Sequence, residues 1–236
     1  MALPVVNNPT YELKLHSVDH KIKYRPFLVK EEKILLTALE GGETADIVRA
    51  TKEIISNCCL DDSVDIEKLP AFDVELFFLN LRARSVGESV EVGMKCQTKD
   101  CDESIAVIVN LEKIGLEINK DHQDLIKLTN KIKVKLKYPD IDRMTRPPEE
   151  SQMDSIFAIT KACIEGIWDD EEYHDIKDYT EQELEDFIMS LNQQQFGKLI
   201  AYFNTMPKLK HEVSFTCPKC GSAQKSVLEG LQSFFG

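Results

Sequence analysis

The spacing of apolar residues predicts the strands and helices of this chain. Over residues 11–24, YELKLHSVDHKIKY, apolar and polar side chains alternate on both sides of a turn, which predicts a β-hairpin. Apolar residues three and four positions apart then predict helices over 29–42, over 44–59 and after Pro70. The third helix has such a wide apolar face that we expect it to pack against two neighbours.

The same signals predict the elements of the second half of the chain. Over residues 132–138 apolar residues alternate with lysines, which is typical of an edge-like, solvated strand. Helical spacing covers 151–166 and returns in a helix that ends at Pro207. Between these two helices, Thr180 and Glu183 form a capping box that opens another helix. Helices grouped apart from antiparallel hairpins predict an α+β fold.

Four of the seven cysteines stand at the turns of two predicted β-hairpins. Cys96 and Cys101 form a CxxxxC pair, Cys217 and Cys220 form a CxxC pair, and alternating residues flank both. We expect the two turns to face each other and to place four thiolates around one ion, as in a zinc ribbon. Thiolates are soft ligands, and four of them close the tetrahedral shell of Zn²⁺, so the predicted role of the metal is structural. Gly221 fits the second turn, where a positive φ is expected.

Other interpretations of the cysteine pairs stay open. CxxC is also the motif of redox dithiols, although that motif usually opens a helix and a strand-like segment follows here. The two pairs are also far apart in the sequence, so they need not share one ion. Three lysines lie beside the cysteines and are expected to offset the charge of four thiolates: Lys95, Lys99 and Lys219. The remaining cysteines have apolar helical neighbours and are predicted to be core residues: Cys58, Cys59 and Cys163.

A shared ion between the two hairpins determines the expected domain organisation. All residues between the two hairpins are then an insertion within one small zinc-binding module. The whole chain is expected to form one compact unit. The expected parts are an N-terminal hairpin and helical region over 1–87, a split zinc ribbon formed by 88–111 and 208–228, an inserted strand and helical region over 112–207, and an aromatic C-terminal tail over 229–236.

The chain is acidic, with a formal net charge of −12, so its field disfavours general binding to nucleic acid. The densest acidic run covers residues 169–186, with ten carboxylates and one lysine. Such a run is typical of a solvated loop and helix start, and the alternative is a docking surface for a basic partner. No apolar stretch is long enough to span a membrane, and the N-terminus lacks a secretory signal, so we expect the protein to fold in cytoplasm.

The sequence contains no pattern of a catalytic site. Phosphate-binding G-x-x-x-x-G-K-[ST], dinucleotide-binding G-x-G-x-x-G, H-E-x-x-H and G-x-S-x-G are all absent. The five histidines are scattered in polar contexts, and carboxylates carry no weight as catalytic candidates in so acidic a chain. We therefore expect no enzymatic activity.

The last residues, LEGLQSFFG, form an unusually apolar chain end. Chain ends fray unless they are held down, so its aromatic residues are expected either to pack on the protein itself or to insert into a partner. The candidate docking residues are Leu231, Phe234 and Phe235.

Taken in order, the segments YRPFLVKEEKILLTALE, LPAFDVELFFLNLRARSVGE, MPKLKHEVSFTCPKCG and VLEGLQSFFG resemble the baseplate hub family of T4-like contractile-tailed phages, from about residue 11 to 236. The resemblance implies a structural or assembly subunit of the virion tail baseplate, made in the host cytoplasm. The implied partners are other hub and tail proteins, with the end of the tape-measure protein as one candidate. The four cysteines carry over as ligands of a structural Zn²⁺, and the aromatic tail as a docking element.

Two competing functions predict different behaviour. A zinc-ribbon nucleic-acid-binding or transcription-associated factor requires a contiguous basic face, for which residues 208–225 offer four lysines and one glutamate. A thiol-disulfide oxidoreductase requires Cys217 and Cys220 to oxidise reversibly without a metal.

Overall fold

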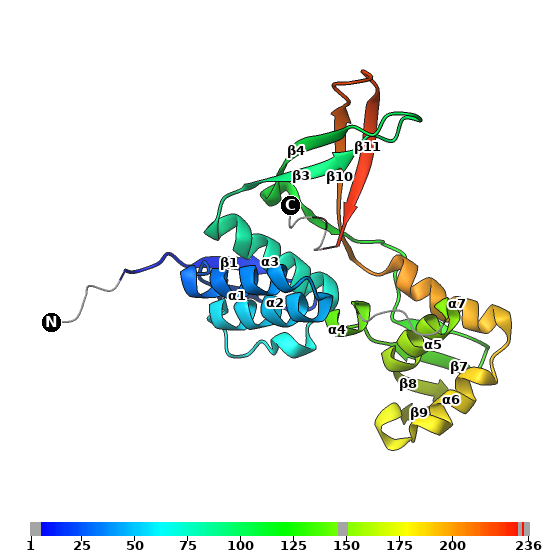
Figure 1. Cartoon of the computed structure of the whole chain (residues 1–236). Helices are drawn as coiled ribbons and strands as arrows, with labels where there is room; N and C mark the ends of the chain where they lie inside the picture. The colour runs from blue at the N-terminus through cyan, green and yellow to red at the C-terminus, as the bar shows by residue number, and fades with distance from the viewer. Residues whose placement is uncertain (1–5, 146–150, 231–232, 234–236) are drawn as a thin grey trace. The chain divides into compact units, whose positions relative to one another are not determined.

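The computed structural model describes residues 6–145, 151–230 and 233, and its contacts divide the chain into two compact units (Figure 1). The first unit consists of residues 1–117 and 208–236, and the second of residues 118–207. Each unit has a hydrophobic cluster built only from its own residues. The sequence predicts one compact unit with an inserted region over 112–207, whereas the contacts separate residues 118–207, which have a hydrophobic cluster of their own.

The first unit begins with the predicted hairpin and three helices. Strands β1 and β2 pair antiparallel, and α1 and α2 lie against each other. Gly42 ends α1 in the left-handed conformation, with a φ of 73°, as expected of a glycine stop. The helix with the wide apolar face is α3, and Phe77 and Phe78 within it are fully buried. The bounds are β1 Tyr11–Lys14, β2 Lys21–Tyr24, α1 Val29–Gly41, α2 Thr44–Cys58 and α3 Ala71–Ser85.

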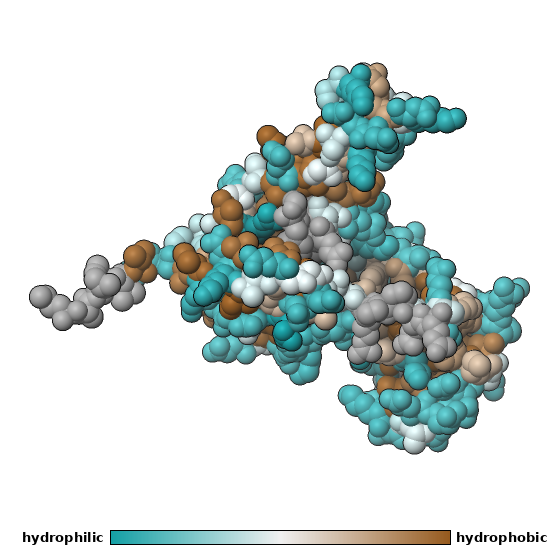
Figure 2. All heavy atoms as spheres, viewed as in Figure 1, coloured by the Kyte–Doolittle hydropathy of each residue, from teal (hydrophilic) through white to brown (hydrophobic). Residues whose placement is uncertain are grey.

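Two long antiparallel hairpins complete the first unit. One hairpin joins β3 and β4, and the other joins β10 and β11, with β5 on the far edge of β10. We call β3, β4, β10 and β11 the ribbon. Its apolar residues gather where the ribbon meets α3, around Leu79, Val90 and Leu209, whereas polar residues cover its tip (Figure 2). The bounds are β3 Ser89–Lys95, β4 Ser104–Asn110, β5 Gly115–Glu117, β10 Lys208–Thr216 and β11 Ala223–Glu229.

The second unit packs helices on an antiparallel sheet of strand order β6-β7-β8-β9. Its core includes Val134, Ile188 and Leu199. The strands are β6 Leu125–Lys127, β7 Ile132–Leu136, β8 Ile164–Asp169 and β9 Glu172–Asp175. The helices are α4 Ile141–Met144, α5 Gln152–Cys163, α6 Glu181–Met189 and α7 Gln193–Thr205.

Two expectations for this second unit are wrong. The pattern over 151–166 predicts one helix, but α5 ends at Cys163 and Ile164 begins β8. The pattern over 132–138 predicts an edge strand, but β7 is central because it pairs with both β6 and β8. The lysines that indicated an edge lie along a strand with two neighbours, and Lys135 pairs with Glu165 of β8 at 3.1 Å.

The fold class is confirmed as α+β with antiparallel hairpins and grouped helices. Within the described part of the chain, no helix has the length and apolar character needed to cross a membrane.

Candidate metal centre

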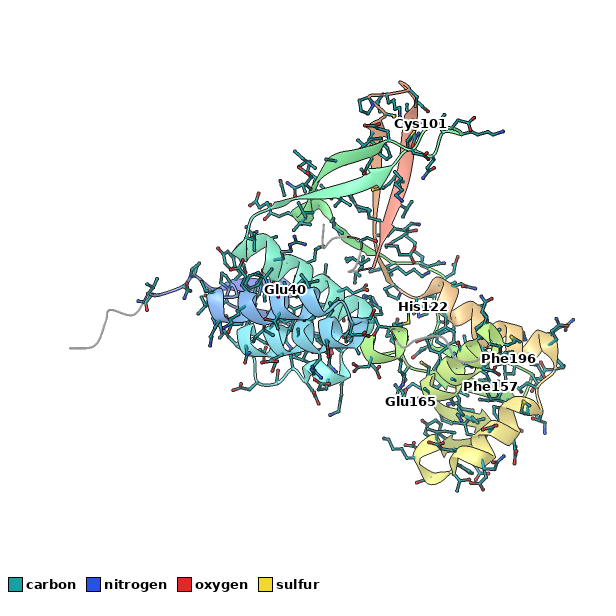
Figure 3. All side chains as sticks on the ribbon, viewed as in Figure 1. Glu40, Cys101, His122, Phe157, Glu165 and Phe196 are labelled. Carbon is teal, nitrogen blue, oxygen red and sulfur yellow. The ribbon has the colours of Figure 1, made fainter. Side chains whose placement is uncertain are left out.

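The tips of the two ribbon hairpins hold the four cysteines predicted as metal ligands, and Figure 3 labels Cys101 among them. Each turn is fixed by its own backbone hydrogen bonds. The N–H of Cys96 donates to the carbonyl of Glu103 at 2.9 Å, and that of Cys101 donates to Thr98 at 3.1 Å. The N–H of Cys217 donates to the carbonyl of Ser222 at 3.0 Å. These bonds hold the cysteines of each pair on the same side of its turn.

Gly221 allows the second turn to close. Its N–H donates to the carbonyl of Cys217 at 2.9 Å, and its φ is 70°. A side chain at this φ is strained, whereas glycine adopts it freely. The expected positive φ is therefore confirmed.

The four sulfurs lie in one cluster, with every pair of Sγ atoms within 4.8 Å. Cys96 and Cys220 are 3.7 Å apart at Sγ, and Cys101 and Cys217 are 3.8 Å apart. Four sulfurs placed about 2.3 Å from one central ion in a tetrahedron lie about 3.8 Å from each other. A disulfide requires about 2.05 Å, so none of these contacts is a disulfide. The thiol chemistry and the spacing both fit a tetrahedral soft cation.

A glutamine outside the predicted ligand set ties the two turns together. The side-chain amide of Gln224, on β11, donates to the Sγ of Cys96 at 2.9 Å and to the hydroxyl of Thr98 at 3.1 Å. Its carbonyl accepts the N–H of Gln97 at 2.9 Å. Gln224 therefore orients one sulfur and bridges the hairpins. No motif marks it, because its role depends on the pairing of distant strands.

The electrostatics of the cluster indicate crowded sulfurs that benefit from a cation. Hydrogen bonds, first from the side chain of Thr98, lower the pKa of Cys96 to about 6. At Cys101 a backbone hydrogen bond at Glu103 lowers the pKa, but desolvation and the neighbouring sulfurs outweigh it and raise the pKa to about 12. A thiol with a pKa as high as that of Cys101 ionises at neutral pH only when a positive charge lies beside it. A divalent cation supplies that charge.

The cluster is buried on one side and reaches solvent on the other. Cys101 and Cys217 are buried, Cys96 is half-buried and Cys220 is exposed. Lys219 pairs with Glu103 of the other hairpin at 3.7 Å, which adds a second link across the tips. The offset of thiolate charge by the neighbouring lysines stays a prediction.

The other predicted site residues have different outcomes. Cys58 and Cys163 are fully buried and apart from the cluster, which confirms them as core residues, whereas Cys59 is half-buried. Burial raises the pKa of the Cys58 thiol to about 11. The candidate docking residues of the tail lie outside the described residues: Leu231, Phe234 and Phe235.

The tips of two hairpins that lie far apart in the sequence therefore meet at one cluster of four cysteines. The family model described as T4 bacteriophage base plate protein matches residues 8–236, so the chain belongs to this family and to the virion tail baseplate, as the resemblance predicts. The chain is 28% identical over 219 residues to the baseplate hub assembly protein gp26 of Enterobacteria phage T4, covering 91% of this chain and 92% of that protein. No solved structure matches it.

Proposed function

We propose that the protein is a structural or assembly subunit of the baseplate hub that acts by binding other hub and tail proteins. The observation that carries this proposal is the similarity to a baseplate hub assembly protein over 91% of the chain. Because it runs through both units, it supports a shared role for the whole chain. The end of the tape-measure protein remains one candidate partner.

We further propose that the four cysteines bind a structural Zn²⁺. Zinc accepts four thiolates in a tetrahedron, and a site filled in this way has no position for a substrate or a water. Cys96, Cys101, Cys217 and Cys220 would then join β3–β4 to β10–β11 at their tips. This role requires no catalysis, which agrees with a non-enzymatic protein.

The structure offers little support for nucleic-acid binding by the ribbon. A basic face requires lysines free to meet phosphates. Instead, each of the four lysines over 208–225 lies within 4 Å of a glutamate carboxylate. The pairs are Lys208–Glu229, Lys210–Glu117, Lys219–Glu103 and Lys225–Glu212. Because these lysines are neutralised and the chain carries a net charge of −12, protein partners are favoured over nucleic acid.

A redox role for the CxxC pair also has little support. Redox dithiols of this kind stand at the start of a helix, which lowers the pKa of the first cysteine. Here Cys217 follows β10, and β11 begins three residues after Cys220. In addition, each of the two sulfurs lies beside a cysteine of the other hairpin.

The proposed hub role is tested by affinity purification from infected cells. The phage that encodes this protein is given a tagged copy, and the co-purifying proteins are identified by mass spectrometry. We expect baseplate hub proteins to be the main partners. Hub complexes that form normally when the gene is deleted would contradict the proposal. Mass spectrometry of mature particles then measures its copy number in the virion.

The metal is tested separately with a cysteine variant. We expect the purified protein to contain one zinc per chain, and Cys217→Ser to lose it, because three thiolates leave the tetrahedron open. Cys59→Ser is the matched control, since its sulfur lies outside the cluster and is half-buried. Elemental analysis of both variants measures the zinc. Equal zinc in both would exclude the proposed ligand set.

A further inference from the structure

The second unit has a groove of about 360 Å³ beside its sheet, within the size range of pockets that hold ligands. The walls come from β7, β8, the short 3₁₀ turn after β9, and α6. Its apolar lining residues are all half-buried, so the core holds them in place while part of each side chain faces the groove. They are Ile132, Ile167, Ile176, Leu184 and Phe187.

The rim of the same groove is polar and carries negative charge. Asp169 and Glu183 line it, together with His174 and Tyr179. The ring Nδ1 of His174 lies 2.6 Å from the hydroxyl of Tyr179, so these two groups satisfy each other. The two carboxylates are exposed to solvent. We call this feature the acid-rimmed groove.

The acidic run of residues 169–186 supplies six of the nine residues that line the acid-rimmed groove, including both of its carboxylates. Of its ten carboxylates, three pair with lysines, in Asp170–Lys131, Asp175–Lys177 and Glu185–Lys161. The other seven form no ion pair with any cation among the described residues. Like charges at this density repel each other, and a cationic partner relieves that repulsion.

The lysines of β7 do not neutralise the groove. Successive side chains of a strand point to opposite faces of the sheet. Ile132 lines the groove, so Lys133 and Lys135 lie on the other face, where Lys135 pairs with Glu165 at 3.1 Å. The sheet therefore separates a lysine-bearing face from the acidic face.

We propose that the acid-rimmed groove binds a lysine- or arginine-rich segment of a partner protein, whose central apolar side chain fills the groove. The inference rests on the proposed function, because it gives the chemistry of one partner of a protein-binding subunit. The apolar walls account for an apolar anchor, which gains affinity by leaving water. The unpaired carboxylates attract basic residues on both sides of that apolar side chain. This attraction speeds the association of the partner and fixes the position of the bound segment. A nucleic acid is repelled by the same carboxylates.

A pair of synthetic peptides tests both parts of the proposal. The first is a short fluorescein-labelled peptide of lysine and glycine with leucine at its centre, and the second replaces the leucine with serine. Fluorescence anisotropy against the full-length protein measures both affinities. We expect the serine peptide to bind about ten-fold more weakly, because it cannot fill the groove. Equal binding would mean that only charge is recognised, which overturns the groove as the site.

A charge reversal at the rim locates the binding. We expect Asp169→Lys to weaken the leucine peptide about five-fold at low salt, since it reverses a rim charge. Glu40→Lys makes the same change of net charge on an exposed residue of α1 in the first unit (Figure 3) and should leave binding unchanged. Circular dichroism of each variant confirms its folding. An equal loss in both variants, or no loss in either, would overturn the proposal.

The same variants separate this inference from the proposed hub role. If Asp169→Lys weakens peptide binding as expected and one hub protein is depleted from the affinity purification, the groove contacts that protein. If the peptides do not bind but all hub proteins still co-purify, the groove proposal fails and the hub role stands. If hub proteins never co-purify, the hub role fails regardless of the peptide result.

Discussion

At the scale of single residues, a buried ion pair organises the helical part of the first unit. Glu31, in the first turn of α1, is only 1% exposed. Its carboxylate accepts a hydrogen bond from the guanidinium of Arg25 at 2.9 Å and another from the N–H of Leu28 at 2.9 Å. Arg25 also donates to the carbonyl of Asn57 at 2.8 Å, so the pair joins β2, α1 and α2. A buried charge satisfied in this way is costly to disturb.

The pair predicts a specific dependence of stability on pH. Desolvation favours a raised pKa at Glu31, but the bonds from Arg25 and Leu28 outweigh it and lower the pKa. A carboxyl whose pKa is lower in the folded state contributes stability above its unfolded value of about 4.3, and that stability is lost as the pH falls below it. We expect Glu31→Gln to lower the free energy of unfolding at pH 7 by about 3 kcal/mol. The variant should also lose less of that free energy than the wild type as the pH falls, because it has no carboxyl to protonate at this position.

Urea unfolding from neutral to acidic pH measures both effects. Glu53→Gln is the control, because Glu53 is exposed on α2. Its stability curve should follow the wild type within about 0.5 kcal/mol. If the Glu31 variant also follows the wild type at every pH, the pair contributes no net stability.

How far single residues of the candidate site can be predicted depends on whether their signal is local. The cysteines Cys217 and Cys220 and the positive φ of Gly221 follow from short spacing rules within one turn. Gln224 has no such signal, since its partner Cys96 is 128 positions away in the sequence. A residue that acts across two hairpins is visible only once the hairpins are placed together.

At the scale of elements, the capping box of α6 is a local signal that the structure confirms. The hydroxyl of Thr180 accepts the N–H of Glu183 at 3.3 Å, and the carboxylate of Glu183 accepts the N–H of Thr180 at 2.8 Å. We expect Thr180→Ala to destabilise the second unit by about 1 kcal/mol, because an N–H at the helix start loses its partner. Hydrogen exchange over 181–189 should rise.

The ribbon provides an internal reference for this experiment. Its amides belong to the other unit, so their exchange should not respond to the loss of a cap in α6. Thr37→Ala, an exposed threonine within α1, is the matched control and should leave the exchange of α6 unchanged. A rise throughout both units would mean that they unfold together.

Elements were predictable where a pattern is strong and uninterrupted, and less so where the pattern is short. The three helices of the first unit follow from long runs of helical spacing, and Gly42 marks one end. In contrast, the apolar run ITKACIEGIW is compatible with a helix or a strand. The chain changes from α5 to β8 after Cys163 because Ile164 and Ile167 pair with β7, a contact that is distant in sequence. The acidic strand β9 was not predicted either, because it forms by pairing with β8 and has no apolar alternation of its own.

At the scale of the whole molecule, the two units differ in what holds them together. The second unit relies on its own apolar core, which includes Leu136, Ile164 and Tyr202. In the first unit, the tips of the ribbon extend beyond the apolar cluster near α3 and meet at the cysteines. We therefore expect the far end of the ribbon to depend on the proposed Zn²⁺ more than any other part of the described chain.

This difference predicts a selective response to metal removal. A structural Zn²⁺ contributes on the order of 10 kcal/mol to the folding of small domains, so its removal should loosen the ribbon tips strongly. We expect a chelator to increase hydrogen exchange over 89–110 and 208–229 while protection over 125–205 is unchanged. Readdition of Zn²⁺ should restore it, and Cys217→Ser should exchange like the chelated protein with or without zinc. Unchanged exchange of the ribbon after complete zinc removal would exclude the proposed structural role of the metal. Equal loosening of the second unit would exclude independent stability of the two units.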